Sequence, residues 1–362
     1  MMKNKEFTHA VTYIALENFV ERSFEIAYEV FHNFYESEEL EAKEFVLALG
    51  EVEFYESLMY HKDMIHSILL SRNYELIEEF FVWKYSVYQS RNINVDSFLI
   101  EYGLWKNSII SHLYQSHSSE IVTIYDYLIL QHEHFKLLAL TRKKIEVEAK
   151  HQILFDDLSN YLLNSQKDEF YKAIETNLPL FNNDIFEFIQ KIINPLMYKV
   201  GNLWQYNQIS VAKEHLATSL TSEIIEKFCV QTNESQRKKG KAIILTVGDE
   251  SHNLGIKIVG KFIDSCGFEV QNLGSKISNQ ELISSVYELR PDLLVFSVTL
   301  PSNIATLQQI VNELKSDSKA FSGLIVVGGQ ALFSNDNNVT IKGADFSSKT
   351  LDDLKIYLNQ LP

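Results

Sequence analysis

The uneven distribution of helix-breaking residues is the feature that most constrains how this chain folds. Of its 13 glycines, only Gly50 and Gly103 precede Gly201, and no proline precedes Pro179. Because glycine and proline interrupt helices and mark turns, the first half is predicted to be almost purely helical. The length of 362 residues allows two or three domains, each with a core of its own.

The composition argues against several classes of protein. With 33 basic and 48 acidic side chains, the formal net charge is −15, which argues against a nucleic-acid partner. Two cysteines, Cys229 and Cys266, cannot make a disulfide framework. The start, MMKNKEF, lacks the apolar core of a signal peptide, and no run approaches the roughly 20 apolar residues of a membrane span. We therefore expect a cytoplasmic protein without a membrane partner.

Residues 1–149 carry apolar side chains at three- and four-residue spacing, which is typical of amphipathic helices packed in a bundle. Helices are expected at 9–35, 44–71, 74–89, 96–114 and 119 to about 164. The last helix has no clear stop, so it is expected to continue into the next domain as a connector. Five or six helices over this length are typical of a globin-like domain.

Residues 150–235 are predicted to form a second, four-helix domain. Its helices are expected at 153–165, 167–177, 183–201 and 211–232, with Pro179 opening a turn and Gly201 closing the third helix. The polar and charged stretch 233–240, NESQRKKG, is typical of a linker.

Residues 240–362 alternate between short apolar runs and helical patterns. The runs cover 242–247, 268–273, 293–298 and 324–327, and the helical patterns cover 254–266, 279–289 and 303–315. This alternation predicts a flavodoxin-like, doubly wound parallel sheet. Because ligands bind such sheets at the carboxyl ends of the strands, the functional loops are expected at 248–255, 297–302 and 328–332.

The loop after the first predicted strand reads Glu250-x-His252-x-x-Gly255. His252 could coordinate a metal through one ring nitrogen, while Glu250 or Asp249 holds the other nitrogen and raises the basicity of the ring. Gly255 allows the backbone to approach a bulky ligand closely. The alternative is a loop histidine that is merely exposed.

Two further loops carry small or hydroxylated residues at strand ends: Ser297 and Thr299 in one, Gly328 and Gly329 in the other. Together the three loops resemble those of the cobalamin-binding domain of methionine synthase and of corrinoid proteins. The resemblance implies that His252 is the lower axial ligand of cobalt and that the other two loops line a slot for the nucleotide tail. The alternative is a flavodoxin-like domain with unrelated loops.

The second domain contains Trp204, then nine residues, then Glu214 and His215. This spacing resembles the helical cap of CarH-type adenosylcobalamin-dependent photoreceptors. The resemblance implies that Trp204 packs over the 5′-deoxyadenosyl group, with Glu214 and His215 beside it. Gln205 stands where those proteins have a histidine that captures cobalt after photolysis, so water or His215 would have to take that role. Without its partners, Trp204 would be better explained as an ordinary core anchor.

The first domain departs from CarH-type repressors, which begin with a basic DNA-binding domain. The first 150 residues hold 14 basic and 24 acidic side chains, a net charge of −10 (14 − 24). A helical, aromatic-rich domain before a cobalamin module resembles the photocobilins, which implies biliverdin. Both cysteines lie outside this domain, so biliverdin would be held non-covalently, with Lys or Arg pairing its propionates. Haem with a histidine ligand, or an empty signalling bundle, are the alternatives.

Together these resemblances imply a light sensor that is not an enzyme. Light would cleave the cobalt–carbon bond of adenosylcobalamin and change the packing of domains or of a homo-oligomeric dimer, which would signal to an unknown downstream protein. The alternative is a corrinoid shuttle for methyl transfer, which would bind methylcobalamin and a methyltransferase partner. A sensor of cobalamin level is a third interpretation.

Overall fold

The computed structural model describes residues 11–142, 144–229, 239–248, 250, 252–316, 321–334 and 337–361. These residues form two compact units. The first runs to Arg142 and includes Gln205–Asn207, and the second runs from residue 144 to Trp204 and from Gln208 onward. Among the described residues, no helix has the length and apolar character needed to cross a membrane.

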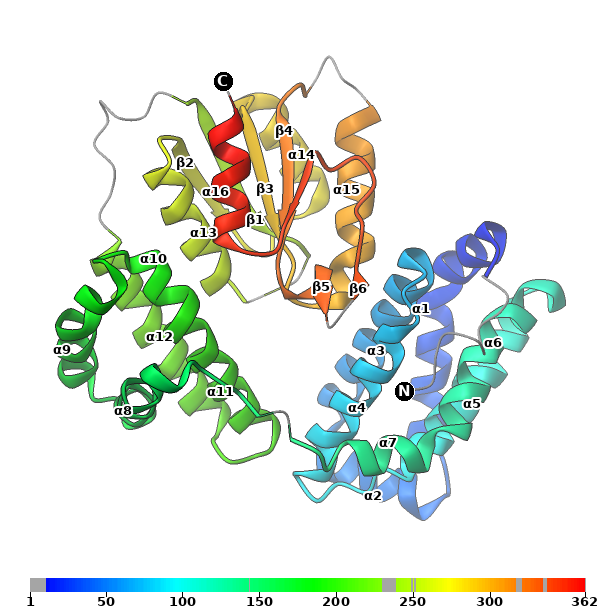
Figure 1. The fold of residues 1–362 in the computed structure, drawn as a ribbon. Helices are drawn as coiled ribbons and strands as arrows, with labels where there is room; N and C mark the ends of the chain where they lie inside the picture. Colours follow the sequence, from blue (N-terminus) through cyan, green and yellow to red (C-terminus); the bar gives the residue numbers. More distant parts are fainter. Residues whose placement is uncertain are drawn as a thin grey trace. The chain divides into compact units, whose positions relative to one another are not determined.

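The first unit is all-helical, as predicted (Figure 1). Its helices are α1 Tyr13–Tyr35, α2 Leu40–Leu49, α3 Glu51–Ser71, α4 Glu75–Gln89, α5 Ser97–His112, α6 Gln115–Leu130 and α7 His132–Leu138. Helix α1 packs against α3, α5 and α6. The core between the helices is rich in fully buried aromatic rings: Phe34, Phe45, Phe54, Phe98, Tyr102 and Trp105. Burial of this aromatic surface stabilises the bundle.

Two helix predictions for this unit are wrong. The expected helix 44–71 is two helices, because Gly50 between α2 and α3 has a φ of 96°, which breaks the helical path. The expected connector helix 119–164 ends at α7, and the next helical turn begins only at Ala149. Between them, Ile145 and Val147 pack on the core of the second unit at two-residue spacing, which is the period of extended chain.

The second unit begins with a helical cap. Its elements are α8 Gln152–Leu163, α9 Lys167–Asn177, a 3-10 turn Leu178–Phe181, α10 Ile185–Phe188, a π-helical turn Ile189–Ile193, α11 Asn194–Gln205 and α12 Val211–Phe228. Gly201 does not close a helix, contrary to prediction. Gly201 does not adopt the positive φ of a helix-ending glycine, and α11 continues through it to Gln205. Trp204 therefore lies in the last turn of α11. Residues 233–238 of the predicted linker lie outside the described residues.

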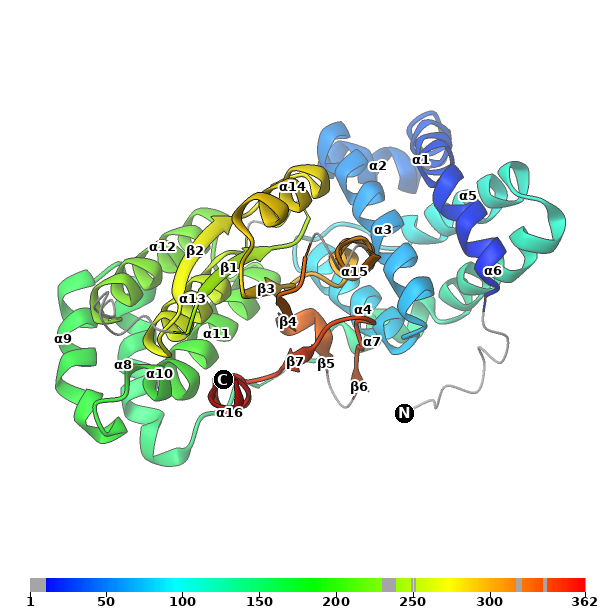
Figure 2. The same ribbon diagram turned by 90° about the horizontal axis from the view of Figure 1, so that it is seen from above.

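A parallel sheet follows, with the strand order β2-β1-β3-β4-β7. The strands are β1 Lys241–Thr246, β2 Glu269–Gly274, β3 Leu293–Ser297, β4 Leu324–Gly328 and β7 Phe346–Ser348, and a small hairpin joins β5 Phe333–Ser334 to β6 Asn337–Asn338. Helices α13 Leu254–Ser265 and α16 Leu351–Gln360 cover one face, and α14 Asn279–Leu289 and α15 Ile304–Ser316 cover the other (Figures 1 and 2). The predicted doubly wound sheet is confirmed.

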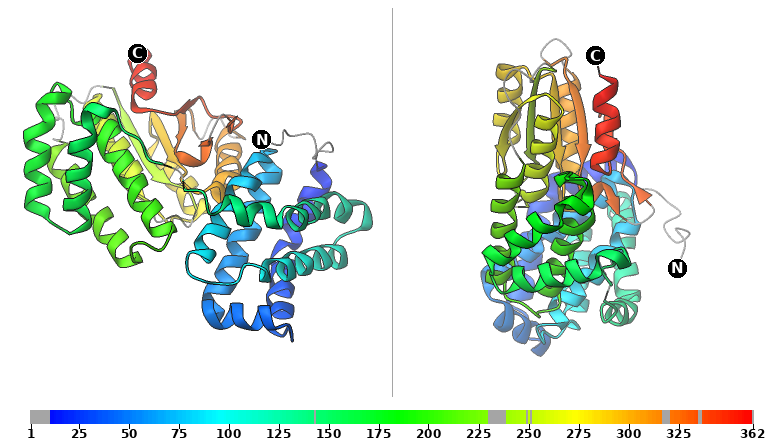
Figure 3. Two further views of the ribbon diagram at one scale, coloured as in Figure 1. Left: turned by 60° about the horizontal axis from the view of Figure 1, so that its bottom comes forward. Right: turned by 60° about the vertical axis from the view of Figure 1, so that its left-hand side comes forward.

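The cap and the sheet share one hydrophobic core that runs from Phe170 in α9 to Ile244 in β1. Polar contacts join the same elements. Lys257 Nζ of α13 donates to Ser222 Oγ of α12 over 3.0 Å, and the backbone N–H of Leu351 donates to the side chain of Gln190 in the π-helical turn. Figure 3 shows the green cap helices beside the yellow part of the sheet domain.

Candidate cobalamin site

The three loops singled out from the sequence lie side by side. In the register of the sheet, Thr246 at the end of β1 pairs with Ser297 at the end of β3, which pairs with Gly328 at the end of β4. Strands β1 and β3 flank the point where the strand order reverses, which is where doubly wound sheets bind ligands. The topology therefore gathers the predicted residues at one edge of the sheet.

Glu250 and His252 form a pair in the loop between β1 and α13. The Glu250 carboxylate is fully buried, and its Oε1 lies 3.2 Å from Nδ1 of His252. The histidine side chain is 57% exposed and is therefore accessible to a ligand from outside the loop. A carboxylate that holds one ring nitrogen while the other faces outward is the arrangement of metal-binding histidines. Asp249, the alternative partner, lies outside the described residues.

Glu250 also joins two of the loops. Its Oε2 accepts a hydrogen bond of 3.0 Å from the backbone N–H of Thr299, so this contact uses the Thr299 main chain and not its hydroxyl. Ser297, two residues earlier, is buried at the end of β3. The loop after β3 thus fixes the carboxylate that in turn orients His252.

The environment of His252 raises its pKa. The largest cause is the interaction with Glu250, which outweighs the opposing effect of burial, and the charge of Glu214 adds to it. Glu214 belongs to α12 of the cap, and the structure thus brings a carboxylate of the predicted cap motif within electrostatic range of the predicted cobalt ligand. Sequence spacing alone did not predict that Glu214 lies near His252.

The three glycines of the site differ in how much room the surrounding protein leaves for a side chain. Gly329 has a φ of 109°, and a Cβ there would lie 2.3 Å from the carbonyl oxygen of Val298, so the loops after β3 and β4 approach too closely for any side chain. At Gly328 a Cβ would meet the carbonyl oxygen of Ser348 at 3.1 Å. Gly255 is exposed, and a Cβ there would meet no atom within 4 Å. Protein packing thus explains Gly329 but leaves open space at Gly255.

One further position in the first loop was missed from the sequence. Gly248 has a φ of 71°, and a Cβ there would lie 2.5 Å from Oδ1 of Asn303. Asn303 comes from the turn that precedes α15, after the Ser297–Thr299 loop. The only sequence signal for the Asn303 contact was that a polar residue follows soon after a predicted strand. Such residues are too common to single one out.

The predicted cap residues occupy the end of α11 and the start of α12. Trp204 is half-buried, and Glu214 accepts hydrogen bonds from its neighbours: Oε2 lies 2.6 Å from His215 Nδ1, and Oε1 accepts from Thr218 at 2.8 Å. The His215 side chain is largely exposed. Gln205 belongs to the first unit, where its side-chain amide donates to Ser86 Oγ over 2.6 Å.

Two family models match this part of the chain, and both are described as a B12 binding domain. One covers residues 154–227 and the other residues 240–346, which correspond to the cap and the sheet. The second unit is a B12-binding cap joined to a Rossmann-like B12-binding domain.

Curated relatives agree with this assignment. Dimethylamine corrinoid protein 2 of Methanosarcina acetivorans is 22% identical over 183 residues, or 50% of this chain and 84% of that protein. Trimethylamine corrinoid protein 2 of Methanosarcina mazei is 24% identical over 151 residues, covering 40% of this chain and 68% of that protein. Among solved structures, the monomethylamine corrinoid protein of Methanosarcina barkeri matches with a TM-score of 0.49 and 18% identity, covering 58% of this chain and 99% of that chain.

The residues of the B12-binding domain fit a corrinoid. Within the described residues the buried Glu250 Oε1 makes no hydrogen bond and lies 3.2 Å from Nδ1 of the exposed His252, and a Cβ at Gly255, in the first turn of α13, would meet no atom within 4 Å. The cofactor contacts predicted for Ser297, Thr299, Gly328 and Gly329 remain predictions, as do those of Trp204, Glu214 and His215.

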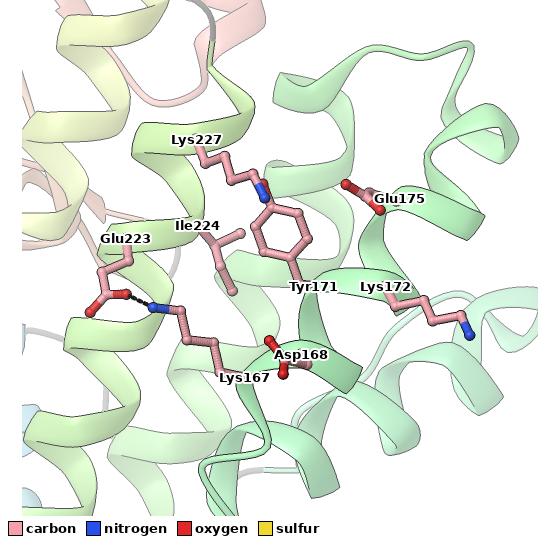
Figure 4. A pocket seen from close by; sticks show the side chains of 8 residues that line it. All are labelled: Lys167, Asp168, Tyr171, Lys172, Glu175, Glu223, Ile224 and Lys227. Atoms are coloured by element: carbon pink, nitrogen blue, oxygen red, sulfur yellow. Dashed lines mark hydrogen bonds and ion pairs between the residues drawn. The ribbon is translucent and has the colours of Figure 1, made fainter.

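A separate hollow of about 630 Å³ lies in the B12-binding cap between α9 and α12 (Figure 4). Its lining combines lysines and acids around one ring: Lys167, Asp168, Tyr171, Lys172, Glu175, Glu223, Ile224 and Lys227. Lys227 Nζ lies 3.3 Å from the centre of the Tyr171 ring, and Lys167 pairs with Glu223. None of the predicted cobalamin residues lines this hollow, so it is distinct from the candidate site.

Proposed function

We propose that this chain is a corrinoid carrier for methyl transfer in which His252 is the lower ligand of cobalt. The observation that carries the proposal is the contact between His252 Nδ1 and the buried Glu250 carboxylate. The names of the curated relatives, which are methylamine corrinoid proteins, support methyl transfer over other corrinoid chemistry. Cobalamin would supply a cobalt centre that forms and releases a cobalt–carbon bond.

The residues of the chain would orient and tune that centre. With cobalamin bound, Glu250 Oε1, which lies 3.2 Å from His252 Nδ1, would accept the Nδ1 proton, fix the tautomer of His252, leave the Nε2 lone pair for cobalt and raise the basicity of the ring. The backbone of Thr299 holds Glu250 in place. Glu214 lies on the cap and adds negative charge near His252. A carrier of this kind has no turnover of its own and needs a methyltransferase partner.

A light sensor that uses adenosylcobalamin is the second candidate, and the cap favours it. Trp204 is half-buried in the last turn of α11, and an indole over the upper face of cobalt would obstruct methyl donors while covering an adenosyl group. The helices of the first unit, α1 to α7, also lie outside both matched regions. Under this candidate the first unit would hold biliverdin, a homodimer would change its packing in light, and a downstream protein would read the change.

One comparison of ligands separates the two candidates. The protein is loaded in the dark with methylcobalamin or adenosylcobalamin, and retention and oligomeric state are measured before and after green light. The carrier predicts that methylcobalamin is retained, that light leaves the oligomeric state unchanged and that Trp204→Ala has little effect. The sensor predicts preferential retention of adenosylcobalamin, its loss in Trp204→Ala, and a change of size in light. Tyr198→Ala, which removes an exposed ring of the same helix, is the matched control.

Both candidates depend on the pair formed by His252 and Glu250, and a second experiment tests that shared part. We expect His252→Ala to abolish the spectral signature of a histidine-bound corrinoid, and Glu250→Gln to weaken corrinoid binding about 10- to 100-fold. Glu288→Gln changes an exposed carboxylate of α14 and should bind as the native chain does. Native affinity in His252→Ala, with an unchanged spectrum, would contradict the assignment of the lower ligand.

A further inference from the structure

We propose that the first unit contains a binding site for a divalent transition-metal ion, formed by Asp96, His132 and Glu133. One ligand atom of each side chain lies within 4.8 Å of the other two. Asp96 precedes α5, while His132 and Glu133 are the first two residues of α7. The site therefore joins two elements that are 36 residues apart in sequence, and it does not depend on the corrinoid function.

The separations between the ligand atoms suit a tetrahedral ion. His132 Nε2 lies 2.9 Å from Asp96 Oδ1 and 3.7 Å from Glu133 Oε1. With metal–ligand bonds of about 2.0 to 2.2 Å, neighbouring ligands of a tetrahedral Zn²⁺ are about 3.3 to 3.5 Å apart. The two separations that involve His132 Nε2 thus lie within about 0.6 Å of those expected around a tetrahedral ion. One imidazole and two carboxylates suit Zn²⁺, Mn²⁺ or Fe²⁺ and leave a fourth position open.

His132 is oriented as a metal ligand. It is buried, and its Nδ1 lies 2.6 Å from the hydroxyl of the fully buried Tyr85. When Nδ1–H donates to that hydroxyl, the Nε2 lone pair points at the two carboxylates. A second partner on the far ring nitrogen is what fixes the tautomer of metal-binding histidines. Asp96 stands at the N-cap position of α5, yet its side chain caps no helical N–H and turns to His132 instead.

The two carboxylates already bind a cation. Lys136 Nζ lies 2.7 Å from Asp96 Oδ1 and 3.1 Å from Glu133 Oε1. Its ammonium group sits on a flexible stem and competes for the same oxygens as a metal ion would. Removing this charge should strengthen metal binding. If the cluster were only an ion-pair network, removing Lys136 would leave two acids without a cation and create no metal site.

The test is titration of the full chain with Zn²⁺, followed by calorimetry, and with Co²⁺, followed by its visible absorption. Three variants are compared with the native chain. His132→Ala removes the nitrogen ligand, Lys136→Met removes the competing cation with little change of length, and His134→Ala removes an exposed histidine of the same helix outside the cluster.

We expect one Zn²⁺ equivalent to bind the native chain, with affinity lowered at least 10-fold in His132→Ala, raised several-fold in Lys136→Met and unchanged in His134→Ala. Co²⁺ should give the intense absorption of a four-coordinate ion in Lys136→Met and lose it in the double variant with His132→Ala. Equal loss in His134→Ala, or no gain in Lys136→Met, would overturn the proposal. Circular dichroism of each variant confirms that the helices are intact.

Discussion

Glu101 is a buried carboxylate held between two nitrogen-bearing side chains of the first unit. Lys84 Nζ lies 2.8 Å from both of its oxygens, and His61 Nδ1 lies 3.0 Å from Oε1. Burial alone would raise the pKa of Glu101, but Lys84 and His61 together lower it to about 2. Burial also lowers the pKa of His61. The Tyr125 hydroxyl lies 3.3 Å from the other ring nitrogen.

Substitution of Glu101 by Gln should destabilise the first unit by about 3 to 5 kcal/mol, because Lys84 would be left buried without an opposite charge. The double variant Lys84→Met with Glu101→Leu removes both charges and should recover most of that loss. Urea unfolding followed by tryptophan fluorescence measures both, since Trp105 stacks on His61 at 4.9 Å. A loss below about 1 kcal/mol in Glu101→Gln would contradict the importance of the pair.

The lowered pKa of Glu101 also predicts that the stability of the first unit depends on pH. The pKa of Glu101 is lower in the folded than in the unfolded chain, so the unfolded chain binds the proton first. The unfolding free energy should therefore fall as the pH drops from about 5 to about 2, and the lowered pKa of His61 adds to this loss already below about pH 6.5. The double variant Lys84→Met with Glu101→Leu lacks the carboxylate, so its unfolding free energy should depend less on pH than that of the native chain.

At the scale of elements, the loop after β4 depends on Gly329. Because its φ is 109° and a Cβ would lie 2.3 Å from the Val298 carbonyl oxygen, Gly329→Ala should cost at least about 2 kcal/mol of unfolding free energy. Gly255→Ala is the matched control, since a Cβ there meets no atom and alanine favours the helix by up to about 1 kcal/mol.

The two alanine variants should separate stability from binding. We expect Gly329→Ala to shift the thermal midpoint downward in the absence of cobalamin, and Gly255→Ala to leave the midpoint unchanged or raised. If Gly255 admits the corrin, its alanine variant should nevertheless bind cobalamin more weakly. Native cobalamin affinity in Gly255→Ala would show that the open space serves no ligand.

The sequence predicts those structural features that depend on residues close together in the chain, and misses those that depend on contacts between distant segments. Helices such as α4 and α9 follow from apolar spacing, and the adjacency of the strand ends at Thr246, Ser297 and Gly328 follows from parallel topology alone. The break after α7 was missed because Ile145 and Val147 continue the apolar pattern in extended form. The edge strand β7 has only three residues, too few for a pattern. The triad at Glu101 joins three helices, and no sequence spacing indicates such a contact.

The division of the chain into two units determines which elements are stabilised when cobalamin binds. Both matched B12-binding regions lie in the second unit, whose cap and sheet share one core, while the first unit has a separate aromatic core. A ligand that binds only the folded second unit, at a free concentration 100 times its Kd, stabilises that unit by about 2.7 kcal/mol. Amide hydrogen exchange measures this stabilisation separately for each helix and strand.

We expect amides of β1, α12 and α13 to exchange about 100-fold more slowly when cobalamin is bound, and those of α3, α4 and α5 to be unchanged in the dark. Apo protein at the same pH is the reference, and His252→Ala with cobalamin is the control for binding through the lower ligand. Equal slowing in both units would contradict their independence. A carrier predicts that light leaves the first unit unaffected, whereas a sensor predicts that illumination changes exchange in α3–α5. The same experiment therefore also separates the two proposed functions.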